Sequence, residues 1–260
     1  GVYDGHGDSP VVDVVTQSLH KAVESEWSNV VEQHKNSLQS GIIAAQQAFK
    51  KAYINVGDMI RNDVARSRLN GAVVSSTILQ PLSCDQEIYA MIHFANIGDV
   101  SAFIAKTNKP FKDAKQLGAL HRAFDPKERE RIEAAGGRVV RGRVNGILEP
   151  SRAFGDTLFP RGVVSYEPTT SSVSLIDRVF DVVVIGSDGL WDALTTMDDR
   201  ERMLSIARNV ELSTVNAAQH IVDLALARGS TDNVAVTVLR LNEWRELLCN
   251  AQQSTPIKDE

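Results

Sequence analysis

Residues 88–105 read IYAMIHFANIGDVSAFIA, and this stretch decides the fold class. From Ile88 to Phe94 apolar residues recur at every second position, which is typical of a β-strand with one buried face. Residues 101–105 (SAFIA) form a second short apolar run, and the residues between the runs (96–100, NIGDV) favour a tight turn. We therefore expect an antiparallel hairpin with Asp99 in its turn.

Two helices and a strand are expected before this hairpin. Apolar residues recur at steps of three and four over 11–31 and again over 42–60, which indicates one apolar face on each helix. Residues 71–80 (GAVVSSTILQ) are rich in β-branched side chains and break this period, so we expect a strand there.

Further elements are expected after the hairpin. Residues 126–135 (PKERERIEAA) begin with proline and end at two glycines, which predicts a helix with both of its boundaries. Residues 182–187 (VVVIGS) predict a strand buried on both faces. Two helices and a final alternating strand follow, at 197–208, 214–228 and 233–241. Because strands and helices cluster without a regular βαβ repeat, we expect an α+β fold with antiparallel sheets.

Composition limits the function classes. The 260 residues are 43% apolar and 23% charged, with a net charge of -5. An acidic chain is poorly suited to nucleic acid or membrane surfaces, and no apolar run is long enough to predict a membrane span. Cys84 and Cys249 lie in unrelated contexts, which favours free thiols in a reducing compartment. We expect an intracellular monomer, in the cytoplasm or the nucleus.

Five aspartates stand at predicted turns. Each alone is ordinary turn chemistry. If they converge, each like-charged pair ~5 Å apart costs about 3 kcal/mol at an effective dielectric constant of ~20. A divalent cation would remove this cost, and oxygen ligands without cysteine or a histidine pair indicate Mg2+ or Mn2+ rather than Zn2+. The five are Asp4 (in DGHG), Asp99 (in NIGD), Asp188 and Asp192 (in SDGLWD) and Asp232 (in STDN).

His6 lies two residues after Asp4 in DGHG, between glycines that leave room for a ligand. We therefore interpret it as a functional residue. Asp125 (in FDP) and Asp156 (in FGD) are interpreted as turn residues only. The remaining histidines are interpreted as structural: His20, His34, His93, His121 and His220.

Seven motifs, taken together, carry a resemblance. They are GVYDGHGD, NGAVVSST, ANIGDVSAFI, DPKERERIEAAGG, RVNGILEPSRAFGD, SDGLWDAL and GSTDNVAVTVL. Their order resembles that of the metal-dependent (type 2C) serine/threonine protein phosphatases over residues 1–241. The resemblance implies an αββα sandwich: two antiparallel sheets packed face to face, a helix pair outside each, and metal ions in a cleft at one end. We expect a single catalytic domain over 1–248 and a polar, frayed tail over 249–260.

The resemblance also implies roles for single residues. His6 would be the general acid that protonates the leaving oxygen, and Asn233 would orient the turn at Asp232. Two ions would be held by Asp4, the Gly5 carbonyl, Asp188 and Asp232. A weaker third ion would match Asp99 and Asp192.

The implied activity is hydrolysis of phosphoserine and phosphothreonine in proteins by metal-activated water, without a phosphoenzyme. The alternative is a catalytically silent relative that serves as a binding module, for which the retained acids have no chemical use. The chain departs from the family pattern at Asp8, where a glycine is usual, and at 118–123 (GALHRA), which lacks the usual aspartate. A phosphate-binding arginine and a metal-binding glutamate normally precede the DGHG motif. We expect an upstream segment that carries both on adjacent strands.

Overall fold

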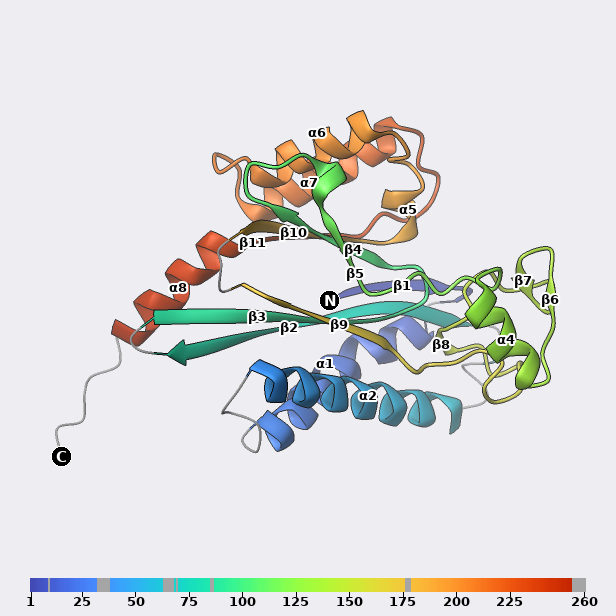
Figure 1. The fold of residues 1–260 in the computed structure, drawn as a ribbon. Coiled ribbons are helices and arrows are strands. Elements are labelled where there is room, and N and C mark those ends of the chain that lie inside the picture. The colour runs from blue at the N-terminus through green and yellow to red at the C-terminus, as the bar shows by residue number, and fades with distance from the viewer. Residues whose placement is uncertain are drawn as a thin grey trace. The chain divides into compact units, whose positions relative to one another are not determined.

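The computed structural model describes residues 1–8, 10–31, 38–62, 68, 70–84, 87–175 and 179–253. The described strands form antiparallel sheets (Figure 1). One has the order β1 (Val2–His6), β2 (Gly71–Cys84), β3 (Glu87–Ile97), β9 (Thr169–Ser174), and β8 (Phe154–Gly155) also pairs with β2. Another has the order β11 (Val236–Arg240), β10 (Phe180–Gly186), β4 (Ser101–Lys106), β5 (Lys115–Leu117). A small pair consists of β6 (Val139–Val140) and β7 (Arg143–Val144).

The chain divides into two compact units. Unit 1 comprises Gly1–Ile78, His93–Ser101 and Gly118–Ser171, and contains α1 (Pro10–Val31), α2 (Leu38–Asn62) and α4 (Pro126–Ala134). Unit 2 comprises Leu79–Ile92, Ala102–Leu117 and Ser172–Glu260. Its described residues contain the short 3-10 helix Phe111–Asp113 and the α-helices α5 (Asp188–Trp191), α6 (Met197–Arg208), α7 (Thr214–Ala227) and α8 (Leu241–Gln253).

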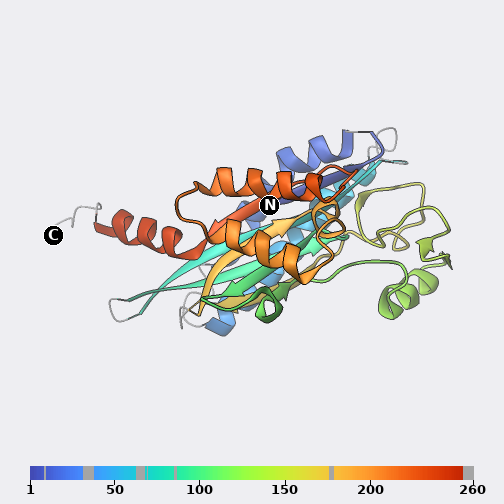
Figure 2. The ribbon, with the colours of Figure 1, turned by 90° about the horizontal axis from the view of Figure 1, so that it is seen from above.

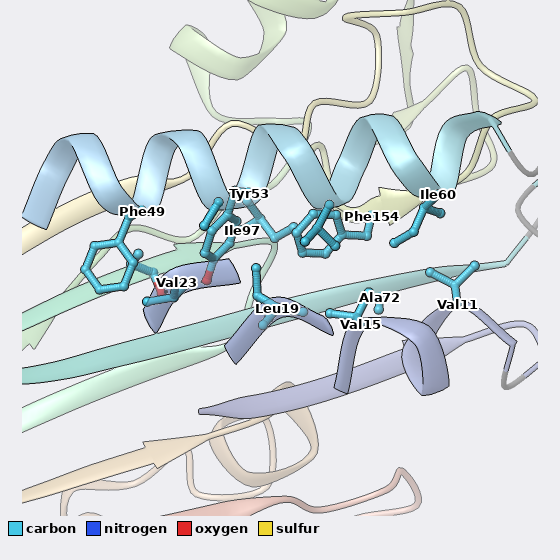
Figure 3. Close-up of a cluster of buried hydrophobic side chains, with 14 of the residues drawn as sticks. Val11, Val15, Leu19, Val23, Phe49, Tyr53, Ile60, Ala72, Ile97 and Phe154 are labelled. Atoms are coloured by element: carbon cyan, nitrogen blue, oxygen red, sulfur yellow. Dashed lines mark hydrogen bonds between the residues drawn. The ribbon is translucent and has the colours of Figure 1, made fainter. Parts of the chain in front are cut away.

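The core of unit 1 lies between the two long helices and the sheet. In Figure 3 the apolar side chains of α1 and α2 point toward one another and toward Ala72, Ile97 and Phe154 of the strands. The buried residues of α1 fall at every fourth position from Val11 to Val23, as the predicted helical period requires. Both predicted helices are therefore confirmed, and burial of this apolar face against the sheet stabilises them.

The core of unit 2 is built in the same way. Leu204 of α6 and Ile221 of α7 pack with Val182, Val184 and other apolar residues of the second sheet. Side-chain oxygens close both helix starts, because Thr196 accepts from the amide of Asp199 and Ser213 accepts from that of Asn216. The predicted helices at 197–208 and 214–228, the buried strand at 182–187 and the α+β class are confirmed.

The predicted hairpin is wrong. β3 pairs within the five-stranded sheet, whereas β4 pairs with β10 and β5 in the other sheet, so the turn at 98–99 carries the chain from one sheet to the other. The half-buried strand is also wrong, since residues 90–97 are buried on both faces. Ala95 and Ile97 pack in the α1–α2 core, while Phe94 and Asn96 lie against the segment that begins at Gly118.

A helix at the end of the chain was not predicted. α8 begins directly after β11 and runs across residue 248, where the sequence analysis placed the end of the catalytic domain. Figures 1 and 2 both show it projecting beyond the end of β11. Residues 254–260 lie outside the described ranges. Across the ranges that the structure describes, no helix combines the length and apolarity needed to span a membrane.

Candidate functional site

The first cluster of predicted site residues lies on β1, in unit 1. Asp4 and His6 are two positions apart on this strand, so their side chains share one face, and both are half-buried. β1 is held by β2, with Asp4 opposite Val73 and His6 opposite Gly71. This pairing fixes the two side chains relative to the sheet.

A third residue comes to His6 from far along the chain. Nε2 of His6 lies 2.7 Å from Oδ2 of Asp156, whose side chain is 3% exposed. An ionised carboxylate can only accept a hydrogen bond, so Nε2 carries the hydrogen. The interpretation of Asp156 as a turn residue only is therefore wrong. Its carbonyl does open a turn, by accepting from the amide of Phe159, but its carboxylate binds His6. Asp125, in contrast, is confirmed as the N-cap of α4.

Acidic neighbours raise the pKa of His6. Burial alone lowers its pKa, but the hydrogen bond and the negative charge of Asp156 act in the opposite direction. The charges of Asp99 and Asp4 add to this effect, so the pKa of His6 is raised above its ordinary value. Asp99 is a buried residue in the turn after β3. The charges of three carboxylates of unit 1 thus act on one histidine, and one of them, Asp156, is in direct contact with it.

The second cluster lies in unit 2, where β10 ends and β11 begins. Gly186 pairs with Val236, so the residues that follow β10 lie beside those that precede β11. Ser187 ties the two segments together, because its Oγ accepts from the amide of Ala235 at 3.1 Å and donates to the carbonyl of Asn233 at 3.2 Å. These contacts bring Asp188 and Asp232 to the same end of the sheet.

A close approach of the backbone at Gly189 to the backbone at Asn233 positions these aspartates. A Cβ at Gly189 would lie 2.5 Å from the carbonyl oxygen of Asn233 and 3.3 Å from Cβ of Asp232, so glycine is required there. Asp192 caps the end of α5 one turn after Asp188, and its amide donates to the Asp188 carbonyl at 2.8 Å. The amide of Asn233 donates to Oδ1 of Asp232 at 2.7 Å.

The donors in both clusters are carboxylate and carbonyl oxygens, the ligands that hard divalent cations prefer. Within the described ranges, however, no three His, Cys, Asp or Glu side chains form a group that could hold a metal ion. The chemistry of the donors therefore fits Mg2+ or Mn2+, while the ligand set stays a prediction.

Two of the histidines interpreted as structural, His93 and His121, have ordinary surroundings. His93 is buried and packs on Trp27 with ring centroids 5.8 Å apart, and Nε2 of His121 lies 2.8 Å from Oγ1 of Thr169. Burial lowers the pKa of each of these two to about 4, which agrees with a structural role. His34 and the side chains of Cys84 and Cys249 lie outside the described residues.

Known proteins resemble this chain over almost its whole length. The chain is 31% identical over 250 residues to probable protein phosphatase 2C 32 of Oryza sativa subsp. japonica, covering 94% of this chain and 58% of the relative. It is 31% identical over 265 residues to probable protein phosphatase 2C 24 of Arabidopsis thaliana, covering 93% and 68%. The chain thus spans between about half and two thirds of the length of such relatives.

Solved structures share the fold. A crystal structure of serine-threonine phosphatase 2C from Toxoplasma gondii matches with a TM-score of 0.67 at 18% identity, over 92% of this chain and 83% of that chain. At this identity the likeness shows the fold alone. The family model described as protein phosphatase 2C matches residues 1–234. This chain therefore belongs to the protein phosphatase 2C family.

Proposed function

We propose that this chain hydrolyses phosphoserine and phosphothreonine monoesters in proteins, with two or three Mg2+ or Mn2+ ions. Membership of a metal-dependent phosphatase family supports this. The observation that carries the proposal is the hydrogen bond between His6 and the buried Asp156, to which the charges of Asp99 and Asp4 add their effect on His6. A proton donor held among acids suits a reaction in which an alkoxide leaves beside cations.

The ions would be held by Asp4, the Gly5 carbonyl, Asp188 and Asp232, with Asp99 and Asp192 for a third. When bound, such ions lower the pKa of water and offset the charge of the phosphoryl oxygens. His6 would give its proton to the serine or threonine oxygen as the ester bond breaks. No side chain takes the phosphoryl group, since water is the nucleophile. Asn233 would orient Asp232 through its backbone N–H, which donates to Oδ1 of Asp232.

The test is a phosphatase assay paired with a metal-binding measurement. We expect Mn2+-dependent hydrolysis of a phosphothreonine peptide and of p-nitrophenyl phosphate that EDTA abolishes. Asp188→Asn and Asp232→Asn should each weaken Mn2+ binding in isothermal titration calorimetry and abolish turnover at low millimolar Mn2+, with an unchanged circular dichroism spectrum. Asp198→Asn is the control, since Asp198 is an exposed acid in the first turn of α6.

The alternative, a silent binding module, makes the opposite prediction. Such a protein would bind a phosphopeptide without releasing phosphate, in the presence or absence of Mn2+. Full Mn2+ affinity in both variants would show that these two aspartates are not ligands.

A further inference from the structure

We propose that Asp156 is a positioning residue, which holds His6 in one orientation and one tautomer, and that Gly71 provides the space in which the pair forms. The role in catalysis rests on the function proposed above. The geometry of the pair does not.

Three adjacent strands bring the two side chains together. His6 of β1 is opposite Gly71 of β2, and Gly71 is opposite Gly155 of β8, so these three residues form one row across the sheet. Asp156 follows Gly155 directly. The imidazole of His6 and the carboxylate of Asp156 therefore meet above Gly71, which has no side chain to separate them.

Gly71 has no room for any side chain. A Cβ there would lie 2.2 Å from Oδ2 of Asp156 and 2.3 Å from Nε2 of His6, the two atoms that form the hydrogen bond. Carbon does not approach such atoms within 3 Å, so even alanine must separate the pair. The absence of a side chain at Gly71 is thus a requirement of the His6–Asp156 contact itself.

The backbone at Asp156 is held in a conformation that suits this task. Its φ of 48° lies in the left-handed region, which asparagine and aspartate tolerate better than most residues. Such conformations are unfavourable and persist where the surroundings fix them, often at functional sites. Here the amide of Asp156 donates to the carbonyl of Asn70 at 3.0 Å, next to Gly71. This contact with the residue that precedes β2 fixes the backbone from which the carboxylate of Asp156 reaches His6.

The hydrogen bond defines the role of each ring nitrogen of His6. Nε2–H donates to Asp156, so the proton that leaves in the reaction is the one on Nδ1. A buried aspartate that fixes the tautomer of a catalytic histidine is an established device in hydrolases on other folds. Asp156 acts through His6 and need not touch the substrate.

The proposed step is hydrolysis of the phosphate ester by water. The water gives one proton to the solvent, and its oxygen forms a bond to phosphorus while the bond to the serine or threonine oxygen breaks. The leaving oxygen keeps the electron pair of that bond and takes the Nδ1 proton. His6 is left neutral with hydrogen on Nε2, and it regains a proton from the solvent.

The activity test compares two leaving groups. The alkoxide of threonine is a poor leaving group and needs the proton from His6, whereas p-nitrophenolate is a good leaving group and does not. For Asp156→Asn we expect kcat on a phosphothreonine peptide to fall by ~10²-fold, the lower end of what a general acid contributes, with KM unchanged. On p-nitrophenyl phosphate we expect a loss of less than about fivefold, and the control Asp198→Asn should match the unmutated chain on both substrates. Equal losses on both substrates would overturn the positioning role.

A double variant tests whether Asp156 acts through His6. His6→Gln removes the proton donor, so His6→Gln with Asp156→Asn should be no slower on the peptide than His6→Gln alone. Additive losses would mean that Asp156 has a separate task. Gly71→Ala should reproduce the selective loss of Asp156→Asn if its circular dichroism spectrum is native. If Gly71→Ala fails to fold, the Asp156 variants decide.

A measurement without turnover separates this inference from the proposed function. In 15N nuclear magnetic resonance of the imidazole, His6 should carry hydrogen on Nε2, and Asp156→Asn should change that signal while the signals of His20 and His220 stay. No change would overturn the inference even in an active enzyme. Absence of hydrolysis by the unmutated chain would overturn the proposed function and leave the pair intact.

Discussion

Replacing Glu128 with glutamine should destabilise unit 1 strongly although the side chain lies outside the proposed site. Glu128 is a buried residue of α4, and its carboxylate accepts hydrogen bonds from three side chains. Ser151 donates at 2.7 Å, Arg131 at 2.9 and 3.1 Å, and Arg152 at distances between 2.5 and 3.1 Å. Removing this charge leaves two arginines without their counterion in a partly buried position.

The pKa of Glu128 gives the magnitude. Burial raises it, but the hydrogen bonds and charges of the partners outweigh burial and lower it from 4.5 to about 2. That difference corresponds to at most about 3–4 kcal/mol at pH 7, and solvent that reaches the arginines reduces this contribution to ~2 kcal/mol. Because the folded pKa is the lower one, this stability is present above pH 4.5 and is lost as the pH falls toward 2.

The assay is urea unfolding at pH 7 and at pH 4, followed by circular dichroism. At pH 7 we expect Glu128→Gln to lower the free energy of unfolding by about 2–4 kcal/mol, since breaking a buried ion pair also leaves its partners uncompensated. The difference from the unmutated chain should shrink at pH 4. Glu130→Gln, an exposed position on the same helix, should change stability by less than about 0.5 kcal/mol. Equal unfolding midpoints for the two variants would refute the reasoning.

Three further perturbations test other parts of the structure. Gly189→Ala should displace the turn at Asp232, because its Cβ would lie 2.5 Å from the Asn233 carbonyl, and so weaken Mn2+ binding in calorimetry; an unchanged affinity would show that this close approach does not place the acid. Asp125→Ala should cost about 1 kcal/mol in urea unfolding, since it removes the N-cap of α4, and a neutral result would contradict the capping role. The pKa of buried His121 is lowered to about 4, so its contribution is full above pH 6.5 and is lost as the pH falls toward 4; His121→Gln should flatten that part of the stability profile, and an unaltered slope would be evidence against burial as its cause.

The helices show what local sequence determines. α4 begins and ends where its own residues require, with Asp125 and Pro126 at the start and Gly136 at the end in the left-handed conformation. α6 and α7 likewise carry their capping residues and their apolar period within their own bounds. These signals act over a few residues, so they could be read without knowledge of the rest of the chain.

Strand pairing was decided only by the tertiary structure. The residues at 96–100 predict a turn equally well whether the chain folds back on β3 or crosses to another sheet, and the crossing is what occurs. The alternation along β3 likewise could not show that its second face is covered, because that cover comes in part from Gly118 and the residues after it. Both errors concern contacts with segments that the local pattern does not contain.

For the candidate site, too, some features could be predicted from the sequence and others depended on the tertiary structure. The sequence pointed to Asp4, His6, Asp188 and Asp232 because motif order and residue type mark them. The structure places Asp4 and His6 on β1, Asp188 shortly after β10 and Asp232 shortly before β11. Asp156 could not be connected to His6 from the sequence, since 150 residues separate them. Only the pairing of three strands, with glycine in the middle one, brings the imidazole and the carboxylate to 2.7 Å. The signals that predict a helix act between residues that are close in sequence. The His6–Asp156 pair depends instead on how distant strands align, and no short stretch of sequence specifies that alignment.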